Sequence, residues 1–189
     1  MGILRIRKVG LLVALAAVLV AGAFFVFGEA DTASAASPHF KGKGVTLTDE
    51  GLILSASGAL AGLGNGDVRI SVTATADPTS TCTNPSGKSQ PPGQNPAPVE
   101  VTGSQSIPAA ELKNGTTPFS VKTEPPVSPI PGAPDCPGSN WTEAITDMAF
   151  TSFTITVEQP AGTTVLTLGA CEISPPSSNG AIPNNNISC

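Results

Sequence analysis

The residues that could perform nucleophilic or acid–base chemistry are few in this sequence. His39 is the only histidine, and it stands between Pro38 and Phe40 near the start of the predicted mature chain. We expect it to lie in a flexible terminus. A Ser-His-Asp or Cys-His centre needs an imidazole beside the nucleophile, so no second candidate base exists for either mechanism.

Paired carboxylates are the remaining catalytic possibility, because glycoside hydrolysis needs only two of them at a set separation. The candidates are Asp49, Glu50, Glu143 and Asp147. The first two precede a glycine and indicate an exposed turn, and we expect the other two to be solvated. Sugar-cleaving sites also tend to present aromatic platforms, whereas Trp141 is the only tryptophan. We therefore expect no enzymatic activity, with a carboxylate-dependent secreted hydrolase as an alternative.

Metal and nucleotide sites are not indicated either. Zinc would need several free Cys or His ligands. Asp67 and Asp135 could contribute to an irregular calcium site, but both are typical of turns. The segment Gly87-Lys88-Ser89 ends like a phosphate loop, yet Cys82 stands where the first glycine should be. The glycines of residues 58–66 lack the strand–helix–strand context of a dinucleotide site. We expect no cofactor.

Four cysteines in an exported chain favour two disulfides, although three pairings are compatible with the sequence alone. We predict Cys82–Cys136 and Cys171–Cys189. The first pair would tie together two proline-rich loops, one near residues 85–98 and one near residues 125–137. The second would pin a polar tail, residues 172–189, onto the last strand.

The N-terminal residues predict export. Arg5, Arg7 and Lys8 precede an apolar run at residues 9–27, and Ala33-Ser34-Ala35 follows it. We predict a signal peptide at residues 1–35, cleaved after Ala35 or Ala36, and hence a secreted protein. The apolar run approaches the ~20 residues that span a bilayer, so an uncleaved membrane anchor with the domain outside is the alternative.

The charge balance restricts the possible partners. The formal net charge is −5 at pH 7, and the lysines and arginines beyond the signal are spread singly. No basic patch could neutralise a run of phosphates, so we do not expect a nucleic-acid partner. An extracellular protein or glycan is the expected partner class.

Hydrophobic periodicity beyond residue 36 is two, which is typical of strands with one buried face. The clearest stretch is residues 68–76, and further candidates are residues 45–48, 52–54, 99–102, 119–123, 153–158 and 165–170. Phe150 lies three residues before Phe153, which indicates a bulge or a strand start between them. Residues 109–112 and 142–147 are expected to form turns at most.

The turn residues favour antiparallel pairing. Asn65-Gly66 and Asn114-Gly115 are typical of tight hairpins, and Pro160-Ala161-Gly162 predicts a further turn. Roughly seven short strands without helices predict an all-β fold, an immunoglobulin-like antiparallel β-sandwich at residues 36–171. A small barrel is the alternative.

Three further segments are distinctive: Gly-Leu-Gly-Asn-Gly-Asp-Val at residues 62–68, Pro-Gly-Gln-Asn-Pro at residues 92–96, and residues 132–143 around Cys136 and Trp141. These segments resemble a family of uncharacterised exported proteins of high-GC Gram-positive bacteria. The resemblance covers most of the mature domain and implies a small exported bacterial domain. It implies no activity, ligand or catalytic residue.

The leading hypothesis is a secreted non-enzymatic β-sandwich that binds or decorates the cell exterior. Its contact surface would be the disulfide-linked proline-rich loops, because rigid loops on a stable scaffold are common sites of recognition. Trp141 follows Cys136 closely and is the candidate binding anchor, with core packing as its alternative role. A structural extracellular or matrix component is the second function class.

Overall fold

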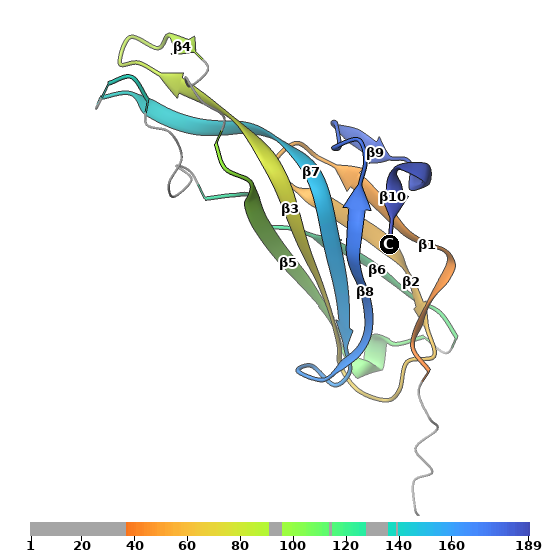
Figure 1. Cartoon of the computed structure of the whole chain (residues 1–189). Coiled ribbons are helices and arrows are strands. Elements are labelled where there is room, and N and C mark those ends of the chain that lie inside the picture. The colour runs from red at the N-terminus through yellow and green to blue at the C-terminus, as the bar shows by residue number, and fades with distance from the viewer. Residues whose placement is uncertain (1–36, 91–95, 114, 128–135, 139) are drawn as a thin grey trace, which may run out of the picture. The chain divides into compact units, whose positions relative to one another are not determined.

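The computed structural model describes residues 37–90, 96–113, 115–127, 136–138 and 140–189. The predicted signal peptide, its cleavage positions and the alternative membrane anchor lie outside these ranges. The described chain is mostly antiparallel β-structure, as predicted (Figure 1). Its strands are β1 (His39–Asp49), β2 (Leu54–Ala61), β3 (Val68–Thr83), β4 (Ser89–Gln90), β5 (Val99–Ile107), β6 (Thr117–Lys122), β7 (Thr142–Glu158), β8 (Thr164–Ile173), β9 (Gly180–Ile182) and β10 (Ile187–Ser188). Two 3₁₀ helices, η1 (Ala109–Glu111) and η2 (Asn184–Asn186), complete the described elements.

The strands form two sheets. One has four strands in the order β6-β2-β1-β9, and the other has six, in the order β10-β8-β7-β3-β4 with β5 also paired to β3. All seven predicted strand segments overlap strands of the structure, although residues 52–54 only reach the first residue of β2. Residues 109–112 contain η1, which agrees with the predicted turn.

A single hydrophobic core joins the two sheets. The alternation at residues 68–76 predicted one buried face, and the five apolar side chains there are at most 1% exposed. They pack in the same cluster as Leu47 and Leu54 of the four-stranded sheet. Each fully buried aliphatic side chain contributes about 1.5–3 kcal/mol relative to an exposed one.

The prediction of at most a turn at residues 142–147 is wrong, because these residues are the first third of β7. Two register shifts against β3 leave Thr146 and Thr151 without an opposite residue. Each extra residue lengthens the spacing between successive buried apolar residues from two to three, so the sequence of β7 does not show the regular period of two of a strand. The second shift is the bulge predicted between Phe150 and Phe153, and it is confirmed.

Two of the three predicted turns are not hairpins. β2 and β3 lie in different sheets, as do β5 and β6, so Asn65-Gly66 and Asn114-Gly115 do not join paired strands; Asn114 itself lies outside the described residues. The Gln159 side chain holds the β2–β3 connection instead. Its Nε2 donates to the carbonyls of Gly64 and Gly66, and its Oε1 accepts the Gly64 amide.

The third predicted turn is confirmed. Pro160-Ala161-Gly162 joins the paired strands β7 and β8. The Gln159 amide donates to the Thr163 carbonyl over 2.8 Å, and the Thr163 amide donates to the Pro160 carbonyl over 2.9 Å. Gly162 supplies the positive φ, 95°, that the turn requires.

A short segment after β6 joins the edges of the two sheets. The Thr123 amide donates to the Leu54 carbonyl and the Thr123 Oγ1 accepts the Leu54 amide, both over 3.0 Å. The next amide, that of Glu124, donates to the Thr102 carbonyl of β5 over 2.7 Å. This approach is possible because residue 103 is glycine: a Cβ there would lie 1.8 Å from the Lys122 carbonyl oxygen.

β3 and β7 continue beyond their neighbours to form an arm, defined as residues 77–83 and 142–150 (Figure 1). β5 pairs with β3 only as far as Ala76. Pro78 follows two residues later, and it tolerates this strand because its nitrogen faces the open edge. The Met148 amide donates to the Gly51 carbonyl and the Phe150 amide to the Ser177 hydroxyl, so neither amide faces β3. Pro78 lies opposite Met148, in a pair of residues that exchange no backbone hydrogen bonds, and the ladder therefore loses nothing from the missing N–H of proline.

The C-terminal tail contributes a short strand to each sheet. β9 pairs with β1, and β10 pairs with β8. Ser177, in the connection from β8 to β9, joins β7 of one sheet to β1 of the other. Its Oγ accepts the Phe150 amide over 2.7 Å and donates to Asp49 Oδ2 over 2.5 Å. Asp49 is 2% exposed, so this hydroxyl satisfies a buried carboxylate.

Gly103→Ala is expected to lower the free energy of unfolding by about 1–3 kcal/mol, because a methyl group would force the segment after β6 away from β5. Gly66→Ala is the matched control, since a Cβ there has ordinary contacts at 3.6 Å and beyond. Urea denaturation followed by circular dichroism measures both. Equal midpoints for the two variants would contradict the proposed close approach.

Ser177→Ala is expected to cost about 1–3 kcal/mol of unfolding free energy, because the Asp49 carboxylate and the Phe150 amide each lose a partner. Ser178→Ala is the control, since Ser178 is exposed. Thermal unfolding of the two variants against the wild type gives the comparison. A Ser177→Ala protein as stable as the control would show that the tail is held elsewhere.

Candidate functional site

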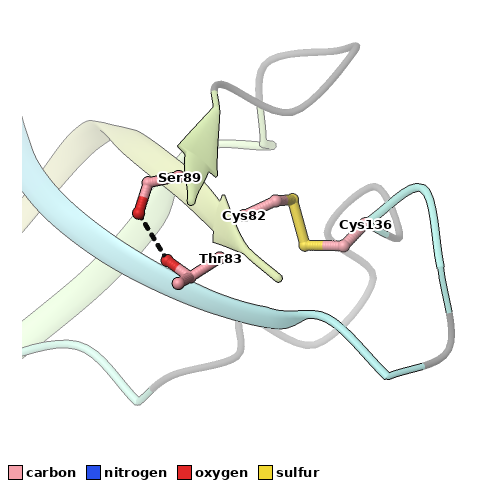
Figure 2. The surroundings of a disulfide bond; sticks show 4 residues. All are labelled: Cys82, Thr83, Ser89 and Cys136. Carbon is pink, nitrogen blue, oxygen red and sulfur yellow. Dashed lines mark hydrogen bonds between the residues drawn. A yellow bond between two sulfur atoms is a disulfide. The ribbon is translucent and has the colours of Figure 1, made fainter. Parts of the chain in front are cut away.

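The candidate site is the tip of the arm, where a disulfide joins β3 to the segment before β7. Both predicted disulfides are present: Cys82–Cys136 at the tip and Cys171–Cys189 between β8 and the C-terminus. Figure 2 shows Cys82 near the end of β3, bonded to Cys136 across the tip. Two disulfides indicate an oxidising environment.

The β3–β4 connection at this tip is a tight, internally bonded turn. Asn84 Oδ1 accepts the amides of Ser86 and Lys88 and the Ser86 hydroxyl, over 2.8–3.0 Å. The Thr83 and Ser89 hydroxyls lie 2.7 Å apart across the hairpin (Figure 2). Residues 85–90 are all exposed, so a preorganised polar loop faces the solvent.

The sequence predicts a proline-rich loop near residues 85–98 but not the hairpin with which it begins, although a signal for the hairpin is present. Gly87-Lys88-Ser89, which ends like a phosphate loop, belongs to this hairpin. The preceding Asn84-Pro85-Ser86-Gly87 combines residues that favour turns for independent reasons. Gly87 has a φ of 80°, a value that glycine adopts without the steric cost of a side chain.

Trp141 lies directly before β7 and is half-buried. Its amide donates to the Gly138 carbonyl over 3.0 Å, closing a turn after Cys136. The indole ring packs against Gly138, where a Cβ would lie 2.7 Å from Trp141 Cδ1. Among the described residues, Trp141 belongs neither to the buried core cluster nor to the partly buried side chains packed against it. Its geometry is therefore that of a side chain held in place at the tip.

The candidate carboxylates have structural partners. The predicted turn at Asp49-Glu50 is present and Glu50 is exposed, but Asp49 is buried, contrary to the prediction: its two oxygens accept from the Gly51 amide and the Ser177 hydroxyl. The Ser177 hydroxyl reaches Asp49 because the tail folds back along the end of β1. Glu50 pairs with Lys122 at 2.7 Å.

The second pair of carboxylates lies along β7. Asp147 Oδ1 accepts from Asn179 Nδ2 at 3.4 Å, and Glu143 is paired in the ladder with Cys82. Both residues are half-buried, so they are less solvated than predicted. The cause is that residues 142–147 continue the β7 ladder and are flanked by β3.

The remaining sequence candidates lie apart from the tip. His39 is the first residue of β1 and is paired with Ala61, so it is not in the flexible terminus that was expected. Asp67 Oδ1 accepts the Ala109 amide at the start of η1, a turn role as predicted. Asp135 lies outside the described residues.

Metal and membrane features were searched in the described ranges only. There, no three His, Cys, Asp or Glu side chains gather closely enough to hold a metal ion. None of the helices in the same ranges has the length and apolar character of a membrane span. Comparisons with protein-family models, curated proteins and solved structures find no match to this chain.

Removing the tip disulfide should cost more stability than removing the tail disulfide. The paired cysteines are 54 residues apart at the tip and 18 apart in the tail. Chain entropy then predicts losses of about 4 and about 3 kcal/mol, respectively. The double variants Cys82→Ala/Cys136→Ala and Cys171→Ala/Cys189→Ala, compared by urea denaturation, test this order. A smaller loss at the tip would mean that residues 83–135 stay compact in the unfolded chain.

Proposed function

We propose that this protein is a secreted, non-enzymatic β-sandwich of immunoglobulin-like topology that binds a protein or glycan at the cell exterior. The strand order supports the topology. β1 and β2 lie in the four-stranded sheet, and the chain then crosses to β3 in the six-stranded sheet. It returns to the first sheet as β6, beside β2, and crosses once more to the second sheet, where β7 and β8 pair. This is the alternation of an immunoglobulin-type Greek key, with β5 as an added strand next to β3.

The arm is the observation that carries the proposed binding role. β3 and β7 extend past the ends of β5 and β8, and their tips carry a disulfide, a preorganised polar hairpin and a half-buried tryptophan. The hairpin at residues 84–90 loses little conformational entropy on binding, because the Asn84 side chain already holds it. Tryptophan is also enriched among residues that dominate binding energies. The contact surface is therefore the arm tip, with Trp141 as its anchor.

Secretion is supported by two independent features. The N-terminal residues carry the basic, apolar and small-residue regions of an export signal, and all four cysteines are in disulfides. The engagement of Asp49 and Glu50 in structural contacts favours a non-enzymatic role.

Trp141→Ala is expected to abolish binding while leaving the fold intact. Its cost in unfolding free energy should be well below the ~3–5 kcal/mol of a truncated core aromatic, because Trp141 lies outside the core. Binding is measured by cosedimentation with peptidoglycan sacculi and on printed glycan and extracellular-protein arrays. Urea denaturation of the same samples measures the fold.

Leu63→Ala is the control, because Leu63 is half-buried at the opposite end of the sandwich, before β3 begins. It should retain binding. Loss of the fold in Trp141→Ala would assign this side chain to packing. Self-association without binding to any probe would favour a structural role instead.

A further inference from the structure

A second surface lies on the outer face of the six-stranded sheet, where hydroxyl side chains stand in register. Ser71 pairs with Ser104 and Thr73 pairs with Thr102, across β3 and β5. These four side chains lie on the face opposite the buried Val72. Directly opposite side chains are about 5 Å apart, and neighbours along a strand are about 7 Å apart. The result is a rectangle of four hydroxyls.

The rectangle is the floor of a shallow hollow of about 450 Å³, lined by Ser71, Thr73, Thr102, Gly103, Ser104 and Glu124. Glu124 supplies its single carboxylate. The residues before it fix the position of Glu124, because Thr123 is bonded twice to Leu54 and the Glu124 amide is bonded to Thr102. The contact at Gly103 that joins the sheets therefore also brings Glu124 into the lining of the hollow.

We propose that this hollow binds a neutral carbohydrate. Each hydroxyl can both donate and accept a hydrogen bond, as the hydroxyls of a sugar do. A carboxylate accepts charge-assisted hydrogen bonds from a polyol and repels anionic ligands. The lining contains no cationic side chain that would select a phosphate or sulfate, and no apolar side chain that would select a lipid.

The arrangement is more specific than a solvated strand surface. Threonine favours strands whatever it binds, so threonines on an outer face alone carry no argument. The feature that points to a ligand is the combination of four hydroxyls in register with an acidic residue, Glu124, whose backbone is hydrogen-bonded to Thr102 beside them. With no aromatic side chain in the lining, the expected affinity is weak, in the millimolar range.

The hollow is distinct from the arm tip. Thr73 and Cys82 are nine residues apart on the same strand, which corresponds to about 30 Å. Binding in the hollow should therefore be independent of Trp141. Carbohydrate binding that Trp141→Ala abolishes and the hollow variants leave intact would assign the ligand to the arm and overturn this inference.

The test uses NMR titration of the full mature protein with maltohexaose, cellohexaose and mannohexaose. At least one should shift the amide signals of Thr73 and Thr102. Thr73→Val/Thr102→Val removes two hydroxyls while keeping β-branched shapes, and Glu124→Gln removes the charge. Each variant should weaken binding by about tenfold, the effect of two neutral hydrogen bonds or one charged bond.

Thr167→Val is the matched control, since Thr167 lies on β8, outside the hollow. It should bind as the wild type does. The proposal would be overturned if both hollow variants bound with unchanged affinity. It would also be overturned if none of the three oligosaccharides shifted these signals at about 10 mM.

Discussion

The β3–β7 ladder is the interaction on which the rest of the structure depends. It runs from Arg69 opposite Glu158 to Thr83 opposite Thr142. Its first half supplies the central strands of the hydrophobic core, and β5 and β8 pair onto its two sides. Its second half continues without those neighbours as the arm. One pair of strands thus positions both the core and the candidate site, so the tip is held by the same hydrogen-bonded ladder that stabilises the fold.

The two proposed surfaces use this ladder differently. The arm tip gains rigidity from covalent and local polar contacts, the Cys82–Cys136 disulfide and the Asn84 turn. The hollow gains its shape from the junction of the sheets, where Gly103 admits the segment that carries Glu124. The first surface depends on loops beyond the core and the second on the regular spacing of strands. A ligand that reaches both proposed surfaces would gain avidity by binding them at the same time.

The sequence predicted those parts of the fold that follow from local chemistry. Strict alternation at residues 68–76 predicted a half-buried strand, and Pro160-Ala161-Gly162 predicted a hairpin, because each signal lies within the segment it describes. Residues 142–147 were missed because bulges at Thr146 and Thr151 interrupt the period of two. The hairpin predicted at Asn65-Gly66 is wrong, because the dipeptide indicates a turn but carries no information on which sheet each flanking strand joins.

The candidate site was predictable only in part for the same reason. The even number of cysteines and the predicted export signal favoured two disulfides but left three pairings open, and the pairing that we predicted is the one present. The burial of Asp49 was not predictable, because its partner Ser177 is 128 residues away in the sequence. The hollow also depends on contacts between distant segments, since the registers of β3 and β5 and the path of residues 122–124 are set by tertiary packing.

The most direct measurement of the central claim is residue-resolved hydrogen exchange of the free protein. Asp77 and Thr79 are the informative positions, because they lie opposite Ala149 and Asp147, where the β7 backbone faces β3. If the ladder continues from the core into the arm, their amides exchange slowly, at rates close to those of the residues facing β7 in the first half of β3. Exchange of these two amides as fast as in an unstructured peptide, beside a protected core, would contradict a rigid arm.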